Sequence, residues 1–383
     1  MIKILFFQPY LAPYRIDFFN ELSKLNNVKV IFAFPNDPLQ NYETKKLIER
    51  VKFKYDYNLN GYKFFARFYA LNRQIRFRLF HYIKTEKPNV LLSHEFGYIT
   101  IMSLLLSKIS SRNIKFFVTT DDSYQTIKDS KAIRKIVIKI ITKFIDGIIV
   151  VNPDTKKWYV TNTQVLDDSV FYLPIITHSG NFIQQLKEAM NKSFENIIKY
   201  DLNDKKILLF VGRIVKEKGV DLLLNVFKKI IDEKAVLIIV GSNDGNFGSK
   251  KSSFIDINQY KTDNRVIFTD RLDSDDLYSF YNLSSCLVLP SIYEPFGAVV
   301  SEALNAGNIV LCSKFAGSSI LIKENENGLL FNPNDADEFE DKLINILKNI
   351  DKTSTETLRI KDSLLFDNLE KKIEDFNNFI TNK

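Results

Sequence analysis

The chain has 383 residues, of which 45% are hydrophobic and 26% are charged, and its net charge is +7. This length exceeds one ordinary hydrophobic core, so two domains are expected, and the composition is ordinary for a globular protein. The longest apolar stretches, near residues 99–106 and 136–151, are short or interrupted by charges. A bilayer span takes ~20 apolar residues, so an integral membrane protein is excluded.

The first half predicts alternating strands and helices, which is typical of a parallel α/β architecture. The apolar N-terminus soon meets Gln8 and Pro9, so it predicts a first strand rather than a signal peptide. Strands are expected at 2–7, 28–33, 90–93, 115–119, 147–151 and 170–176, and helices include 16–25 and 182–198.

The second half predicts the same alternation again. Strands are expected at 206–211, 235–240, 266–268, 286–289 and 308–312, with helices at 220–231, 277–282, 338–350 and about 365–379. Cys286 and Cys312 each lie in an apolar, strand-like run, which predicts buried, unpaired thiols rather than a disulfide or a metal site. Free thiols fit a reducing, cytoplasmic compartment.

The strongest chemical signal runs from Pro290 to Ala303. A buried strand ends there, a loop carries Glu294, and a helix is expected to begin near Phe296. Ligands of open α/β sheets bind at such carboxyl ends of strands. Gly297 permits close approach to the backbone, the amides at the helix start favour negative charge, and Glu302 suits a pair of ribose hydroxyls. The alternative is that both carboxylates only favour the helix dipole.

A second signal follows the first strand of the second half, where Gly212, Arg213, Lys218 and Gly219 share one loop. An Arg fork and a Lys point charge suit a diphosphate and neutralise charge as it leaves. Each cation alone is more often a surface residue. Their position at another strand end of the same sheet favours the ligand role.

With these motifs the chain resembles the family 4 glycosyltransferases, which are retaining enzymes of the GT-B fold. The match covers roughly residues 205–335 and includes Asn327-Gly328. The resemblance implies that Arg213 and Lys218 bind the donor diphosphate and that Glu302 binds the ribose. It also implies that Glu294 binds the donor sugar, and that Glu294, Arg213 and Lys218 act in catalysis. The remaining implied donor-binding positions are Gly212, Phe296, Gly297 and Ala298.

The first half resembles the family more weakly. The loop after its first strand lacks the glycine pair of many members, and Arg15 is a candidate cation there. His94 ends a strand as a histidine does in the family, with a structural role as the alternative. Asp121 stands where many members have a second histidine. Arg15, His94 and Asp121 are therefore the acceptor or cleft candidates.

Charge is uneven along the chain. Residues 1–200 contain 30 Lys and Arg against 17 Asp and Glu, which leaves 23 against 29 for residues 201–383. Two aromatic or apolar basic segments, at residues 64–80 and 131–139, are candidates for an anionic membrane surface. For either segment alone the preferred interpretation is an ordinary domain helix with its apolar side inward. No nucleic-acid-binding module is recognised.

Taken together, the sequence predicts an α/β protein of the GT-B class, with two Rossmann-like domains whose parallel sheets face each other across a cleft. Residues 1–175 are expected to bind the acceptor and 176–361 the donor, with a helix at about 362–383 packed back on the first domain. The expected reaction is retaining transfer of a hexosyl group from a nucleoside diphosphate sugar to a hydroxyl of a glycan or lipid-linked acceptor, in bacterial cell-surface polysaccharide assembly.

No cofactor and no metal are expected, because Arg213 and Lys218 supply the charge neutralisation. The Asp273-Ser-Asp275 and Asp335-Ala-Asp337 triplets are interpreted as helix starts. The expected location is cytoplasmic, peripheral at the inner face of the cell membrane. The alternatives are another GT-B enzyme, such as a sugar-nucleotide epimerase or a phosphorylase, or a non-catalytic module that binds sugar nucleotide or membrane.

Overall fold

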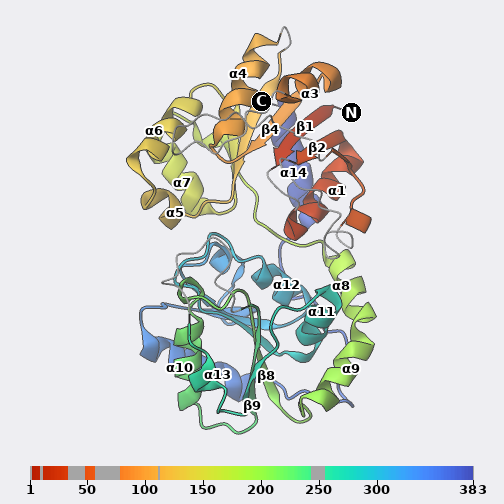
Figure 1. Ribbon diagram of the computed structural model, residues 1–383, viewed down its shortest axis with the longest axis vertical. Helices are drawn as coiled ribbons and strands as arrows, with labels where there is room; N and C mark the ends of the chain where they lie inside the picture. The colour runs from red at the N-terminus through yellow and green to blue at the C-terminus, as the bar shows by residue number, and fades with distance from the viewer. Residues whose placement is uncertain are drawn as a thin grey trace, which may run out of the picture. The chain divides into compact units, whose positions relative to one another are not determined.

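The computed structural model describes residues 2–8, 12–32, 48–56, 78–110, 113–242 and 255–382. The chain forms two compact units. Unit 1 comprises Met1–Ile175 and Leu369–Lys383, and unit 2 comprises Ile176–Asn368. Each unit is a parallel sheet covered by helices (Figure 1).

Unit 1 is built on a seven-stranded parallel sheet in the order β3-β2-β1-β4-β5-β6-β7. The chain order reverses between β1 and β4, and such a switch point leaves a crevice at the carboxyl ends of the two strands. The strands are β1 (Lys3–Gln8), β2 (Asn27–Phe32), β3 (Lys54–Asp56), β4 (Val90–His94), β5 (Lys115–Thr120), β6 (Gly147–Val150) and β7 (Val170–Tyr172).

Helices cover both faces of this sheet, because successive side chains of a strand point to opposite faces. Phe7 and Phe116 join the core beneath α3 to α7, while Phe6 and Phe117 face the other way and contact α1 and α14. The C-terminal α14 lies beside α1, and Phe376 contacts Phe18 (Figure 1). The helices are α1 (Pro13–Leu25), α3 (Arg78–Glu86), α4 (Tyr98–Ile109), α5 (Tyr124–Lys128), α6 (Ala132–Ile141), α7 (Pro153–Asn162) and α14 (Leu369–Asn382).

Unit 2 repeats the plan with a six-stranded parallel sheet in the order β10-β9-β8-β11-β12-β13. The switch point lies between β8 and β11. The strands are β8 (Lys206–Val211), β9 (Ala235–Val240), β10 (Val266–Phe268), β11 (Cys286–Leu289), β12 (Ile309–Ser313) and β13 (Gly328–Phe331). Their apolar runs are nearly continuous, as expected of a sheet that is buried on both faces.

The helices of unit 2 also form two layers. One layer contains α10 (Val220–Lys229) and α13 (Ala336–Asn349), which share a core with the sheet. In the other, α11 (Ser274–Leu283) packs against α8 (Ser179–Glu188) and α9 (Met190–Lys199), and α12 (Val299–Asn305) packs against α8. The two layers leave the carboxyl ends of β8, β11 and β12 to be closed by loops.

The predicted α/β class with two parallel sheets is confirmed. The helical pattern expected at 182–198 forms two helices, because α8 ends at Glu188 and α9 begins at Met190. The sequence analysis missed β3, a polar edge strand, and β13, which begins at Gly328. Cys286 and Cys312 are free and buried, and burial raises the pKa of each thiol to about 12. Among the described residues, no helix has the length and apolar character needed to cross a membrane.

The final helix supplies a test of unit 1. Phe376 is fully buried and packs on Phe18 and Phe171, so Phe376→Ala should lower the free energy of unfolding of unit 1 by about 3–5 kcal/mol. Leu166→Ala, at an exposed position of the same unit, should change it by less than about 0.5 kcal/mol. Urea unfolding monitored by circular dichroism measures both. Equal midpoints for the two variants would contradict the packing of α14 on this unit.

Candidate functional site

The donor-site candidates of unit 2 lie on loops that follow neighbouring strands. Gly212, Arg213 and Lys218 follow β8, and Glu294 follows β11. A third loop, from Lys314 to Ser318, follows β12. Because β8, β11 and β12 are adjacent in the sheet, their carboxyl ends bring the three loops to one edge.

Hydrogen bonds and one ion pair fasten these loops together. The Lys218 ammonium donates to the Glu294 carboxylate, and the side chains are 20% and 9% exposed. The amides of Ile292 and Tyr293 both donate to the Glu217 carbonyl at 3.0 Å. On the other side, the amide of Gly317 donates to the Glu294 carbonyl at 3.2 Å. The loop that carries Glu294 is therefore held from both neighbouring strands.

Two glycines permit this close packing. Gly219 has φ +66°, and a Cβ there would lie 2.0 Å from the Pro290 carbonyl oxygen. Gly297 has φ +95°, and a Cβ there would lie 2.8 Å from Leu289 and 2.9 Å from the Ser318 hydroxyl. Side chains other than glycine rarely adopt these angles, so both loop shapes depend on glycine.

Glu302 lies in the first turn of α12, the helix that the Glu294 loop leads into. It accepts a hydrogen bond of 2.7 Å from the hydroxyl of Tyr281, which is buried in α11. Burial and the Glu302 carboxylate raise the pKa of Tyr281 well above its ordinary value, so Tyr281 stays a donor. The carboxylate thus has a fixed orientation. Tyr281 could not be predicted as a site residue from the local motif, because it lies 21 residues away in sequence.

The remaining donor-site candidates differ in exposure. Arg213 is exposed, Phe296 is buried, and Gly297 and Ala298 are partly exposed at the start of α12. The structure therefore places an exposed guanidinium, a partly buried ammonium and two carboxylates on one edge of one sheet. Such a set suits a ligand with an anionic group and several hydroxyls.

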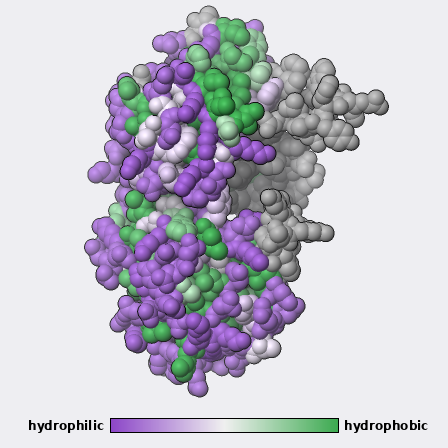
Figure 2. All heavy atoms as spheres, turned by 90° about the vertical axis from the view of Figure 1, so that its left-hand side faces the viewer, coloured by the Kyte–Doolittle hydropathy of each residue, from purple (hydrophilic) through white to green (hydrophobic). Residues whose placement is uncertain are grey.

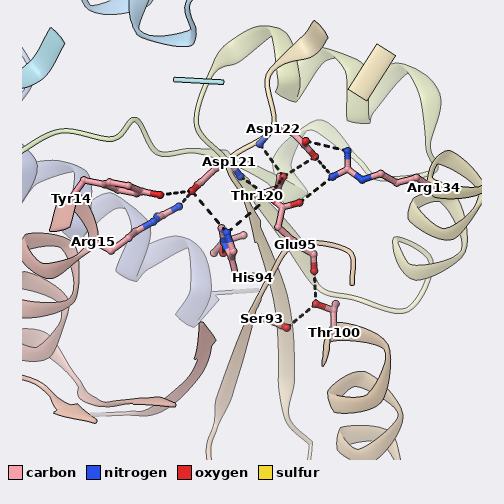
Figure 3. Close-up of polar contacts among 11 residues, drawn as sticks. Tyr14, Arg15, Ser93, His94, Glu95, Thr100, Thr120, Asp121, Asp122 and Arg134 are labelled. Atoms are coloured by element: carbon pink, nitrogen blue, oxygen red, sulfur yellow. Dashed lines mark hydrogen bonds and ion pairs between the residues drawn. The ribbon is translucent and has the colours of Figure 1, made fainter. Parts of the chain in front are cut away.

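The three candidates of unit 1 also converge, at the switch point between β1 and β4 (Figure 3). The Arg15 guanidinium, from the first turn of α1, donates to the Asp121 carboxylate, and the Tyr14 hydroxyl donates to it at 3.0 Å. Nε2 of His94, at the end of β4, lies 3.9 Å from the same carboxylate. Nδ1 of His94 lies 3.1 Å from the Thr119 hydroxyl. Arg15 is buried, so it is not a plain surface residue.

The protonation states of this cluster follow from burial and neighbouring charge. Burial lowers the pKa of His94 to about 4. The Asp121 carboxylate acts to raise this pKa, and the Arg15 charge acts to lower it further. Burial acts to raise the pKa of Asp121, but Arg15, His94 and Tyr14 outweigh it, so this pKa is lowered. At neutral pH a neutral imidazole therefore lies beside an ionised carboxylate.

Beside this cluster lies a second one that the sequence analysis missed. Glu95, directly after β4, accepts hydrogen bonds from the Asp121 amide at 3.0 Å and the Thr120 hydroxyl at 3.1 Å. Arg134, from α6, binds Glu95 at 3.0 Å and Asp122 at 2.6 Å (Figure 3). Arg134 belongs to the basic segment at residues 131–139, but its guanidinium points at these carboxylates and not outward.

Glu95 is unusual in backbone and in charge. It has φ +63°, a conformation that non-glycine residues rarely adopt and that often marks functional sites. A third of its side chain reaches solvent, but Arg134, Thr120 and the Asp121 amide enclose the carboxyl oxygens. This burial, with Asp122 and Asp121 nearby, raises the pKa of Glu95 to about 7.

The Asp triplets behave as helix starts. Asp273 accepts from the Asp276 amide at the beginning of α11, and Asp335 accepts from the Glu338 amide at the beginning of α13. That prediction is confirmed. Within the parts of the chain that the structure describes, no group of three or more His, Cys, Asp or Glu side chains is arranged to hold a metal ion.

Several known proteins are similar to this chain in sequence or fold. Residues 193–357 match the family described as glycosyl transferases group 1. An uncharacterised glycosyltransferase of Methanocaldococcus jannaschii is 34% identical over 35% of this chain and 34% of its own length. The capsular polysaccharide biosynthesis glycosyltransferase CapM of Staphylococcus aureus is 24% identical over 65% of each chain. The matched part is thus only about a third of the first relative and just under two thirds of the second.

Among solved structures, Anabaena HepE in complex with UDP and glucose superposes with a TM-score of 0.72 at 14% identity, over 100% of both chains. This likeness concerns the fold, which is the GT-B class expected from the sequence. The resemblance inferred from the motifs is confirmed at the level of the group 1 glycosyltransferases, and the matched residues 193–357 lie within unit 2.

The buried histidine supplies a test of unit 1. The imidazole of His94 should remain neutral down to about pH 5, since its pKa is about 4. Its contribution to stability is full above the ordinary pKa of 6.5 and is lost as the pH falls through 4. Titration of the ring protons by NMR measures this, with the signal that is absent from His94→Gln assigned to His94. A titration midpoint near 6.5 would contradict the burial of this ring.

Proposed function

We propose that this protein is a retaining glycosyltransferase of the family 4 type, which transfers a hexosyl group from a nucleoside diphosphate sugar to a hydroxyl. The observation that carries the proposal is the joined edge of unit 2, where Arg213, Lys218, Glu294 and Glu302 lie on the loop after β8, the loop after β11 and the start of α12. The family match over residues 193–357 covers all four positions.

In this proposal the cations receive the diphosphate. Arg213 is exposed and can pair with two phosphate oxygens, while Lys218 supplies a point charge. A phosphate would compete with Glu294 for the Lys218 ammonium, which frees the Glu294 carboxylate for sugar hydroxyls. Glu302, oriented by Tyr281, would accept the ribose hydroxyls.

The amides of Phe296, Gly297 and Ala298 would bind polar oxygens of the donor. Because positive charge would neutralise the leaving diphosphate, no cofactor or metal is required. The solved structure of HepE, a structural neighbour, contains UDP and glucose, which supports a sugar nucleotide as the ligand class.

We assign the acceptor to unit 1. Asp121 presents a carboxylate that is 20% exposed, held by Arg15 and Tyr14 beside neutral His94. Carboxylate and imidazole acceptors suit the hydroxyls of a glycan. The similarity to CapM, named for capsular polysaccharide biosynthesis, supports a cell-surface polysaccharide as the product.

The proposed setting is the cytoplasmic face of the cell membrane, with a lipid-linked acceptor and peripheral attachment. The excess of 30 basic over 17 acidic residues in residues 1–200 supports an anionic surface as a partner of this half. No nucleic acid is proposed as a partner.

Removal of the diphosphate-binding charges should abolish most turnover. Arg213→Ala and Lys218→Met should each lower kcat about 100-fold, since one such donor contributes ~3 kcal/mol to the transition state. Lys216→Ala changes an exposed lysine of the same loop and should leave kcat unchanged. The assay is release of nucleoside diphosphate from a donor that the wild type cleaves, with circular dichroism to show folding. Near-normal turnover in both site variants would remove the diphosphate assignment.

Turnover should survive chelation of divalent metal ions. The charge neutralisation is assigned to Arg213 and Lys218, so excess EDTA should lower the rate by less than about twofold. The comparison is the rate before and after dialysis against EDTA, with Mg²⁺ and Mn²⁺ added back separately. Loss of turnover that either ion restores would contradict this assignment. Asp121 and Asp122 would then be candidate metal ligands.

A further inference from the structure

Helix α6 of unit 1 carries apolar side chains on its outward side. Ile133 is 70% exposed, Ile136 56% and Ile140 52%, and Phe144 follows in the next turn at 56%. Within α6 the spacing of three to four residues aligns the three isoleucines in one row, and Phe144 follows three residues after the helix ends. We call Ile133, Ile136, Ile140 and Phe144 the outer row. The interpretation of this helix as apolar inward and basic outward is therefore wrong for the outer row.

The inward side of α6 fixes this orientation. Arg134 is bound to Asp122 at 2.6 Å and to Glu95 at 3.0 Å, and Ile138 and Ile141 are buried in the core of unit 1. A rotation that buried the outer row would remove Arg134 from both carboxylates and expose Ile138. The loss of two partly buried ion pairs makes that rotation unfavourable. The exposure of the outer row is thus a fixed property of the fold.

Positive charge surrounds the outer row. Apart from the inward-facing Arg134, residues 128–144 contain five basic residues and one acidic residue. Lys131, Lys139 and Lys143 are exposed and, within the residues that the structure describes, have no ion-pair partner. The face of unit 1 that carries α6 is turned toward the viewer in Figure 2, where hydrophobic atoms lie open among polar ones.

From this placement we propose that the outer row and its lysines dock unit 1 on an anionic lipid bilayer. A short amphipathic helix that combines exposed apolar side chains with flanking lysines lies in the plane of a membrane interface, with its apolar side at the acyl boundary. The lysines then lie at the depth of the anionic headgroups. A soluble protein partner would also cover the apolar row, but the unpaired lysines favour a surface of dense negative charge.

The outer row is distinct from the other basic segment, at residues 64–80. Phe64, Phe65, Arg73 and Arg76 lie outside the described residues, as does the side chain of Arg78. The proposal deepens the proposed function, because it names the surface that would bring unit 1 to a lipid-linked acceptor. Vesicle binding itself requires neither donor nor turnover, so the two proposals can fail separately.

Helix α6 also connects this surface to the site. Arg134 lies between Ile133 and Lys135 in sequence and contacts Glu95, whose carboxylate accepts from the amide of Asp121. Docking through the outer row would therefore hold the cluster of Arg15, His94 and Asp121, which we assign to the acceptor, at the membrane surface.

The test is co-sedimentation of the full chain with vesicles. The wild type should bind vesicles that contain phosphatidylglycerol and phosphatidylcholine, and it should bind vesicles of pure phosphatidylcholine at least about tenfold more weakly. Binding to the anionic vesicles should weaken as the salt concentration rises. The double variant Ile136→Glu/Ile140→Glu and the triple variant Lys131→Gln/Lys139→Gln/Lys143→Gln should each reduce the partition coefficient on the order of tenfold or more. The matched control is Ile198→Glu/Ile231→Glu, which changes two isoleucines of unit 2 that are 79% and 91% exposed, and it should bind as the wild type does.

Circular dichroism and thermal stabilisation by a donor sugar nucleotide show that each variant is folded. Wild-type binding that is absent, or equal on neutral and anionic vesicles, would overturn the proposal, as would variants that bind like wild type or a control that loses binding equally. A wild-type dimer in light scattering that Ile136→Glu/Ile140→Glu dissociates would assign the outer row to a second copy of the chain and would likewise overturn it. Vesicle binding as expected, without donor binding, would retain this inference and remove the proposed function.

Discussion

The ion pair between Lys218 and Glu294 joins the loops that leave the two strands on either side of the switch point in unit 2. Around it, the Glu217 carbonyl binds two amides of the Glu294 loop, and Gly219 and Gly297 let the backbones approach. The positions of Phe296, Ala298 and Glu302 follow from that closure, because α12 begins where the Glu294 loop ends. The parallel sheet thus brings the loops to one edge, and the ion pair between Lys218 and Glu294 joins two of them.

Unit 1 uses the same topology for a different chemistry. At its switch point the charges are arranged in two linked clusters, Arg15 with Asp121 and Arg134 with Asp122 and Glu95. Burial keeps His94 neutral at neutral pH. Burial also raises the pKa of Glu95 to about 7, so near neutral pH Glu95 is present in both its protonated and its ionised form. The edge of unit 2 carries the exposed guanidinium of Arg213, whereas at this edge the guanidinium groups of Arg15 and Arg134 are bound to carboxylates. In the proposed function, this difference suits a diphosphate at unit 2 and an acceptor hydroxyl at unit 1.

Much of the candidate site could be predicted from the sequence where its residues lie close together in the chain. Glu294, Gly297 and Glu302 share one strand–loop–helix segment, so their proximity follows from chain geometry. The link between Arg134 and Glu95 could not be predicted in this way, because it joins residues 39 positions apart and depends on the packing of α6. The outward side of α6 was equally hidden, since Ile133, Ile136 and Ile140 alternate with Val137, Ile138 and Ile141 and both sets are apolar. The ion pairs of Arg134 and the burial of Ile138 and Ile141 in the core show which set faces inward.

The proposed function requires that the joined edge of unit 2 bind a nucleoside diphosphate sugar. The most direct measurement is thermal unfolding of the full chain with UDP-, GDP- and ADP-sugars, each in large excess. A ligand at ~100 times its dissociation constant stabilises the folded state by ~2.7 kcal/mol, so at least one donor should raise the Tm by several degrees. That shift should be lost in Arg213→Ala and in Glu302→Ala. No shift with any of the three classes, or a shift that both variants retain, would contradict the account.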